Sequence, residues 1–139
     1  MLAAYQRKSE GAGMIQSLFN QTNYVATKKL LDATVLRHEA ISSNLANVET
    51  PAYKRVDVAQ NFQTELSLAL NSNDMTRMGM LRPTVSQDLT AISSNRDGNT
   101  VKLEQEMLEM NQNTVAHTLE TQLVSGSLLK LRLAITGRA

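Results

Sequence analysis

The sequence has 139 residues, of which 14 are basic and 13 acidic, and it contains no cysteine. This length provides one domain or less, which excludes a large enzyme core, and the missing cysteines exclude disulfides and thiol chemistry. The charges are mixed along the chain without a basic block of the kind that binds nucleic acid, and no apolar run approaches the length of a membrane span.

A long helix is predicted over residues 15–50. Residues 1–14 are polar, carry two glycines and lack the apolar core of a signal peptide, so we expect a flexible leader there. From residue 15 to 48 the chain has no proline or glycine, and apolar residues recur at the helical period. The stripe expected to pack against other helices contains Leu31, Val35, Ile41 and Leu45.

The predicted helix ends at a corner over residues 44–55. Asn44 and Asn47 lie three residues apart, so they share a helix face and can bond the last carbonyl groups, which have no partner within the helix. Pro51 has no backbone donor and moves Thr50 out of the α region. We therefore expect the helix to end near residue 48 or 49.

Residues 51–98 form the predicted middle segment. Alternation around residues 56–58 permits a very short strand, and the spacing of apolar residues predicts a short helix over 60–70. Residues 75–99 have only isolated apolar side chains among polar ones, so we expect an irregular linker that is poorly ordered in the isolated protein.

A second long helix is predicted over residues 99–139, with Asn99 or Thr100 as its cap. Its main apolar stripe, expected to be buried against the first helix, consists of Leu108, Val115, Leu119, Leu123, Leu129 and Leu133. A second apolar face, expected to meet partner helices, consists of Met107, Met110, Val124, Leu128, Leu131 and Ile135. We expect Gly126 to allow another helix to approach closely.

These elements predict an all-α fold. The long terminal helices, over residues 15–50 and 99–139, would pack as one antiparallel hairpin or coiled coil, and the middle segment would supply the short helix and the irregular linker. Such a hairpin leaves the second apolar face without cover in one chain, which favours assembly of many copies.

No catalytic, metal or cofactor site is predicted. His38 and His117, one on each long helix, make at most half of a metal site, and a solvated or half-buried histidine is the favoured interpretation. Glu104 and Glu106 are two residues apart and point to different helix faces, which argues against an acid/base pair. Glycine loops for phosphate and nucleophile motifs are absent from the sequence.

The corner resembles the amino-terminal signature of the bacterial flagellar axial proteins, which form the rod and hook. The resemblance is carried by Asn44, Leu45, Ala46, Asn47, Thr50, Pro51, Tyr53 and Lys54, followed by residues 97–101 before the last helix. The short chain is most similar to proximal rod members. It departs from them at Ala52, where the family usually has glycine, and at Lys102, where an acidic residue is common.

The resemblance implies a structural, non-enzymatic subunit of the proximal rod that polymerises through its terminal helices and transmits torque between the membrane ring and the distal rod. It implies partners among copies of the chain, other rod proteins, the membrane-ring and ring–rod junction proteins and the flagellar export apparatus, without nucleic acid, substrate or cofactor. It also implies location in the basal body after export without a cleaved signal peptide. The alternatives are a coiled-coil adaptor or another axial subunit.

Overall fold

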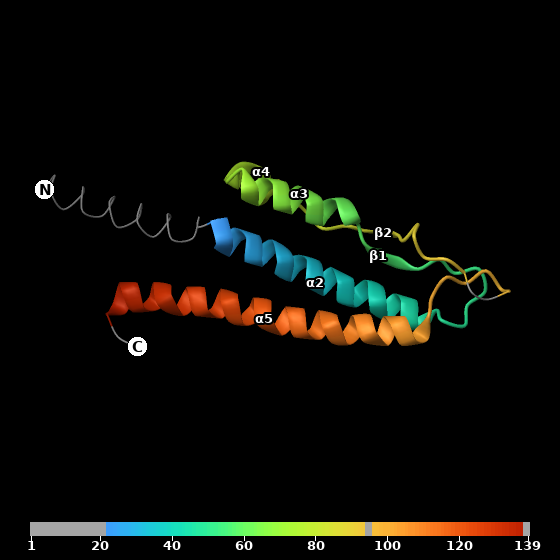
Figure 1. Ribbon diagram of the computed structural model, residues 1–139. Helices are drawn as coiled ribbons and strands as arrows, with labels where there is room; N and C mark the ends of the chain where they lie inside the picture. The colour runs from blue at the N-terminus through green and yellow to red at the C-terminus, as the bar shows by residue number, and fades with distance from the viewer. Residues whose placement is uncertain (1–21, 94–95, 138–139) are drawn as a thin grey trace, which may run out of the picture.

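The structure, a computed structural model, describes residues 22–93 and 96–137 (Figure 1). The predicted leader, and the beginning of the first helix over residues 15–21, lie outside this part of the chain. The described elements, in chain order, are α2 (Thr22–Ala46), β1 (Val56–Val58), α3 (Gln60–Asn71), α4 (Met75–Met80), β2 (Val85–Gln87) and α5 (Leu103–Thr136).

The fold is mainly helical, with a long helix toward each end of the chain, as predicted. Helix α2 lies in the middle, with α3 and α4 on one side and α5 on the other (Figure 1). At about 1.5 Å per residue, the 34-residue α5 is about 50 Å long, longer than the 25-residue α2 beside it. No helix among the described residues is long and apolar enough to cross a membrane.

The apolar core lies between α2 and the α3–α4 layer. It is formed by Ala26, Val58, Phe62, Leu66, Ala69 and Met78. Phe62, Leu66 and Ala69 follow each other at spacings of four and three, so one face of α3 is buried against α2. The short middle helix was therefore predicted with nearly its observed bounds.

The prediction of an irregular linker over residues 75–99 was wrong in part, because this segment contains α4 and β2. Asp74 begins α4 by accepting a hydrogen bond from the backbone N–H of Arg77 at 2.9 Å. Met78 is fully buried in the core. Met78 joins the core cluster with Ala26 of α2, an interaction that the sequence pattern of the segment does not reveal.

Strands β1 and β2 of the middle segment form a two-stranded antiparallel sheet. The all-α prediction did not include this small β component. Val56 pairs with Gln87, Asp57 with Ser86, and Val58 with Val85. The strand that the sequence permitted at residues 56–58 is therefore present, while its partner strand β2 was not predicted. All three residues of β2 are exposed, so this strand has no apolar alternation to mark it.

The predicted cap of α5 was also wrong. The helix begins at Leu103 after Lys102, and no side chain caps it. Asn99 and Thr100 are buried and bond to other parts of the chain, because both face the corner that follows α2. Gly137 follows the helix in the left-handed conformation, with φ 64°, which is common where helices end.

Candidate functional site

The corner after α2 is held by its own side chains and by a distant asparagine. Asn47 Nδ2 donates to the Ser43 carbonyl at 2.9 Å, and the Thr50 hydroxyl donates to Asn47 Oδ1 at 3.1 Å. Asn99 Nδ2 contacts the carbonyl oxygens of Asn47, Val48 and Thr50, each at 2.9 Å. Asn99 thus shares with Asn47 the bonding of carbonyl groups at the carboxyl end of α2, which sequence reasoning assigned to Asn44 and Asn47.

Ala52 forms the tightest part of this corner. Its φ is 60°, in the left-handed region that glycine adopts without a steric penalty. Its backbone N–H donates to the Asp97 carbonyl at 2.9 Å, next to Gly98, which also has a positive φ of 76°. The corner keeps the conformation expected for glycine at this position, although it is occupied by an alanine.

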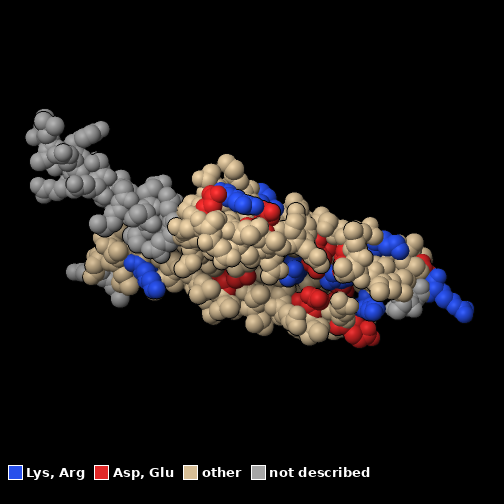
Figure 2. All heavy atoms as spheres, turned by 45° about the horizontal axis from the view of Figure 1, so that its top comes forward, with Lys and Arg blue, Asp and Glu red and all other residues tan. Residues whose placement is uncertain are grey.

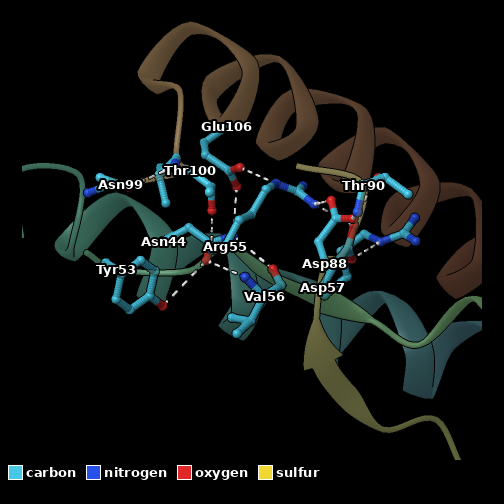
Figure 3. A network of polar contacts seen from close by, with 12 residues as sticks. Asn44, Tyr53, Arg55, Val56, Asp57, Asp88, Thr90, Asn99, Thr100 and Glu106 are labelled. Carbon is cyan, nitrogen blue, oxygen red and sulfur yellow. Dashed lines mark hydrogen bonds and ion pairs between the residues drawn. The ribbon is translucent and has the colours of Figure 1, made fainter. Parts of the chain in front are cut away.

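Beyond the corner, five side chains form a cluster that we call the polar clamp: Asn44, Arg55, Asp57, Asp88 and Glu106 (Figure 3). Arg55 Nε donates to Glu106 Oε1 at 2.6 Å, and its Nη1 donates to Asp88 Oδ2 at 2.8 Å and to Asp57 Oδ2 at 3.2 Å. The polar clamp therefore joins β1, the segment after β2, and α5 through one guanidinium.

Asn44 connects the polar clamp to α2. Its Nδ2 donates to the Val56 carbonyl at 2.9 Å and to Glu106 Oε2 at 3.0 Å, while its Oδ1 accepts from the Val56 N–H at 3.0 Å. The carboxamide therefore bonds β1 as a neighbouring strand would, on the edge that β2 leaves free. Asn44 is fully buried. It lies at the helix end, as predicted, and it also bonds residues 12 and 62 positions away in the chain.

The polar clamp holds one cation, Arg55, against three carboxylates, of which Asp57 also pairs with Arg37 outside the clamp. Burial alone would lower the pKa of Arg55, but the hydrogen bond and charge of Glu106 and the charge of Asp57 raise it above its usual value. Burial alone would raise the pKa of Asp88, but hydrogen bonds from Thr90 and Arg55 lower it. These shifts keep the arginine and Asp88 ionised at neutral pH, so the ion pair persists.

Comparison with known proteins identifies the family. No family model matches the chain. A flagellar basal body rod protein FlgB from Borrelia hermsii is 32% identical over 113 residues, which are 68% of this chain and 82% of that protein. The FlgB of Aquifex aeolicus is 30% identical over 115 residues, and the match covers 81% of this chain and 91% of its relative. The FlgB of Buchnera aphidicola is 26% identical over 137 residues, covering 86% of this chain and all of that protein.

The chain belongs to the FlgB family. The flagellar resemblance seen at Asn44, Asn47, Thr50 and Tyr53 is thereby confirmed, at the level of a basal body rod protein. In this FlgB-family chain the motif residues gather at one place. Tyr53 Oη contacts Ser43 Oγ at 3.1 Å and donates to Asn44 Oδ1 at 3.4 Å, and Lys54 Nζ donates to the Gly98 carbonyl at 2.9 Å.

The predicted burial of the main α5 stripe against α2 was wrong. Five members of the stripe are exposed by more than half, namely Leu108, Val115, Leu119, Leu123 and Leu129, while Leu133 is half-buried. The α5 face that contacts α2 is polar instead: Asn44 bonds Glu106, Thr34 bonds Glu120, and Asn113 Nδ2 donates to the Thr34 carbonyl at 2.9 Å. The helical period shows that one face is apolar, but it cannot show which neighbour covers that face.

The predicted residues of α2 are divided between the core and the surface. Ile41 is buried, Leu31 and Leu45 are half-buried, and Val35 is 46% exposed. A Cβ built on Gly126 of α5 would meet no heavy atom within 4 Å, so no described part of this chain makes the close approach expected there.

The two histidines lie apart from the polar clamp. His38 is exposed, and His117 Nδ1 lies 3.4 Å from the Thr34 hydroxyl. Residues 22–93 and 96–137 contain no group of three histidine or carboxylate side chains placed to hold a metal ion.

Sequence reasoning missed the polar clamp. Arg55 was placed beside the corner motif and Glu106 was considered only for acid/base chemistry, but the two residues are 51 positions apart and no local pattern links them.

Proposed function

We propose that this FlgB-family chain is a structural subunit of the proximal rod, which polymerises through its terminal helices and transmits torque between the membrane ring and the distal rod. In this proposal α2 and α5 act together as an antiparallel helical hairpin, and no chemical step is involved. The name shared by the relatives, flagellar basal body rod protein, supports the location.

The observation that carries the proposal is the uncovered apolar face of α5. Leu108, Val115 and Leu119 are 58%, 70% and 56% exposed, at spacings of seven and four residues that align them on one side of the helix. Burial of apolar surface contributes roughly 25 cal/mol per Å², so covering this face by neighbouring subunits supplies a driving force for assembly. A long apolar stripe facing solvent marks an interaction surface.

The polar clamp supports the mechanical part of the proposal. Arg55 and Glu106 connect β1 to α5, and Asn44 connects both to α2. A subunit that transmits torque must keep its helices in register when a lateral force acts on them. Several hydrogen bonds to buried charged groups resist such sliding more strongly than apolar contacts, because their energy falls steeply with distance and angle.

The proposed partners are copies of this chain, other rod proteins, and the membrane-ring and ring–rod junction proteins. Delivery would use the flagellar export apparatus without cleavage of a signal peptide. The polymer would lie in the basal body, between the membrane ring and the distal rod.

The test replaces Leu119 by aspartate in the flagellated bacterium and measures the chain in purified basal bodies. Because Leu119 is 56% exposed, the Leu119→Asp chain should fold and accumulate normally but be depleted from basal bodies. Thr121→Asp is the matched control: it adds the same charge two residues away, on the other side of the helix, and should leave incorporation unchanged. Complete basal bodies in a strain that lacks this gene would refute the rod assignment.

A further inference from the structure

A groove runs over α2 between α3 and α5. Its volume is about 610 Å³. The walls include apolar side chains of Leu30, Phe62 and Ala116, and the polar groups include Thr34, Asn113 and Glu120. Figure 2 shows acidic residues along the α5 side of the hollowed middle of the molecule. A groove of this size, with apolar walls and a few polar groups, has the character of a binding site.

One acceptor in the groove has no donor. Asn113 is only 5% exposed, and its Nδ2 donates to the Thr34 carbonyl, but its Oδ1 has no hydrogen-bond partner among the described residues. A buried amide oxygen without a donor is destabilising, because it has lost its hydration and gained no hydrogen bond in return. The groove is therefore incomplete in the isolated chain.

Glu120 is a second acceptor in the groove, and its one hydrogen-bond donor, the Thr34 hydroxyl, is shared with another acceptor. The Thr34 hydroxyl lies 2.9 Å from Glu120 Oε2 and also 2.9 Å from the Leu31 carbonyl, yet it has a single proton to donate. Burial raises the pKa of Glu120, while the bond to Thr34 and the charge of His117 oppose this shift. No cation forms an ion pair with Glu120 in the described part of the chain; Arg37, which also lines the groove, pairs with Asp57.

A complementary surface lies near the carboxyl end of α5. Leu128, Arg132 and Ile135 follow each other at spacings of four and three, and Leu129 lies beside them, so an arginine is framed by apolar residues on one helix face. All four are exposed, and Arg132 forms no ion pair with any described residue. Figure 2 shows a basic group at this end of α5 with no acidic group beside it.

We propose that this basic apolar face of one copy docks into the groove of a second copy, so that Arg132 of the first copy pairs with Glu120 of the second. A guanidinium has five N–H donors, so it can bond the carboxylate and offer a further donor toward Asn113, which bonds the same Thr34. Within one chain the two partners are 12 residues apart on a continuous helix, about 18 Å, so they cannot meet. The contact joins two different surfaces, and its repetition makes an open array. This inference rests on the proposed polymeric rod for its biological setting.

Disulfide crosslinking tests this contact directly, since the chain has no cysteine of its own. The full-length chain carries Ala116→Cys in the groove and Leu128→Cys on the basic apolar face. Two samples are oxidised: the purified chain at high concentration, and flagellated cells that express it. The two cysteines lie too far apart along α5 to bond within one chain. A head-to-tail contact should therefore give a ladder of dimers, trimers and longer species, whereas each single-cysteine variant should remain monomeric.

Charge exchange tests the pair at the centre of the contact. Adding Arg132→Glu or Glu120→Lys to the double-cysteine chain should reduce the crosslinked yield by at least about tenfold, and the two changes together should restore it. Glu104→Lys, an exposed change outside the groove, should have no effect, and circular dichroism checks the fold of each variant. The exposed Arg132 keeps the test valid if Glu120→Lys perturbs folding.

Absence of a ladder in both samples, or a ladder indifferent to charge exchange, would overturn the proposed contact. So would dimers formed by a single-cysteine variant, which indicate a symmetric contact. If the chain is still recovered in basal bodies without crosslinks, the rod function stands and only the contact is wrong. If the ladder forms in the purified chain but the protein is missing from basal bodies, the contact is correct and the rod function is wrong.

Discussion

Arg55 and Glu106 form a hydrogen-bonded ion pair with an Nε–Oε1 distance of 2.6 Å, and their side chains are 4% and 0% exposed. The pair joins the strand after the corner to the first turns of α5. A buried pair of this kind stabilises the fold less than its short distance suggests, because both groups lose their hydration. Removal of one partner is costly, however, because the other charge remains buried.

Replacement of Glu106 by glutamine should lower the free energy of unfolding by about 3 kcal/mol, toward the low end of the range for broken buried pairs, because Asp88 and Asp57 still contact Arg55. Urea denaturation measures this change. Glu104→Gln, on an exposed side chain of the same helix, should change stability by less than about 0.5 kcal/mol. Equal stability of both variants would show that the pair does not hold α5 in place.

Replacement of Ala52 by glycine should stabilise the chain. A left-handed alanine costs about 1–2 kcal/mol, which glycine avoids. Glycine loses about 0.5–1 kcal/mol more conformational entropy on folding, so the expected net gain in stability is about 0.5–1 kcal/mol. Thermal or urea unfolding measures it. The control Ala134→Gly, in the helical α5, should destabilise by up to about 1 kcal/mol. A loss of stability at both positions would contradict the strain assigned to the corner.

Asp88 should make stability fall in acid. Its pKa is lowered from 3.8 in the folded chain, so its carboxylate contributes stability that is complete above the ordinary value and is lost as the pH falls through the lowered one. Asp88→Asn should therefore be less stable than the parent at neutral pH, and this difference should shrink below about pH 4. Urea denaturation across pH 2–7 measures it. Asp32→Asn, at an exposed position, should follow the parent curve, and a parallel shift of the Asp88 variant at every pH would contradict the assignment.

Glu120 should change the pH dependence of stability in the opposite direction. Its pKa is raised from 4.5, so its contribution is most favourable when protonated and is lost as the pH rises through the raised value. Glu120→Gln should match the parent at low pH and exceed its stability at neutral pH, because the amide removes a partly buried charge that has no cation. The same pH series measures this difference. Glu39→Gln, on an exposed part of α2, should show no such gain, and a neutral-pH loss in the Glu120 variant would refute the assignment.

The sequence by itself determined the two long helices, the corner between residues 44 and 55, the short helix after it, and the flagellar family. These features depend on local chemistry: the 3.6-residue period, the missing donor of Pro51, and side chains a few positions apart. The departure from glycine at Ala52 was also visible in the sequence, but it left open whether the backbone is strained there or forms another turn, and the positive φ shows the former.

Only the tertiary structure decided which neighbour each face meets. Asn99 closes α2 from 49–52 residues away, and Arg55 finds Glu106 across 51 residues, so neither contact leaves a local pattern. The apolar stripe with Leu119 was visible in the sequence, but periodicity does not distinguish a face buried within the chain from one left for another subunit. Helix α2 is covered by α3 and α4, so its apolar side is already occupied, and the stripe of α5 is left exposed.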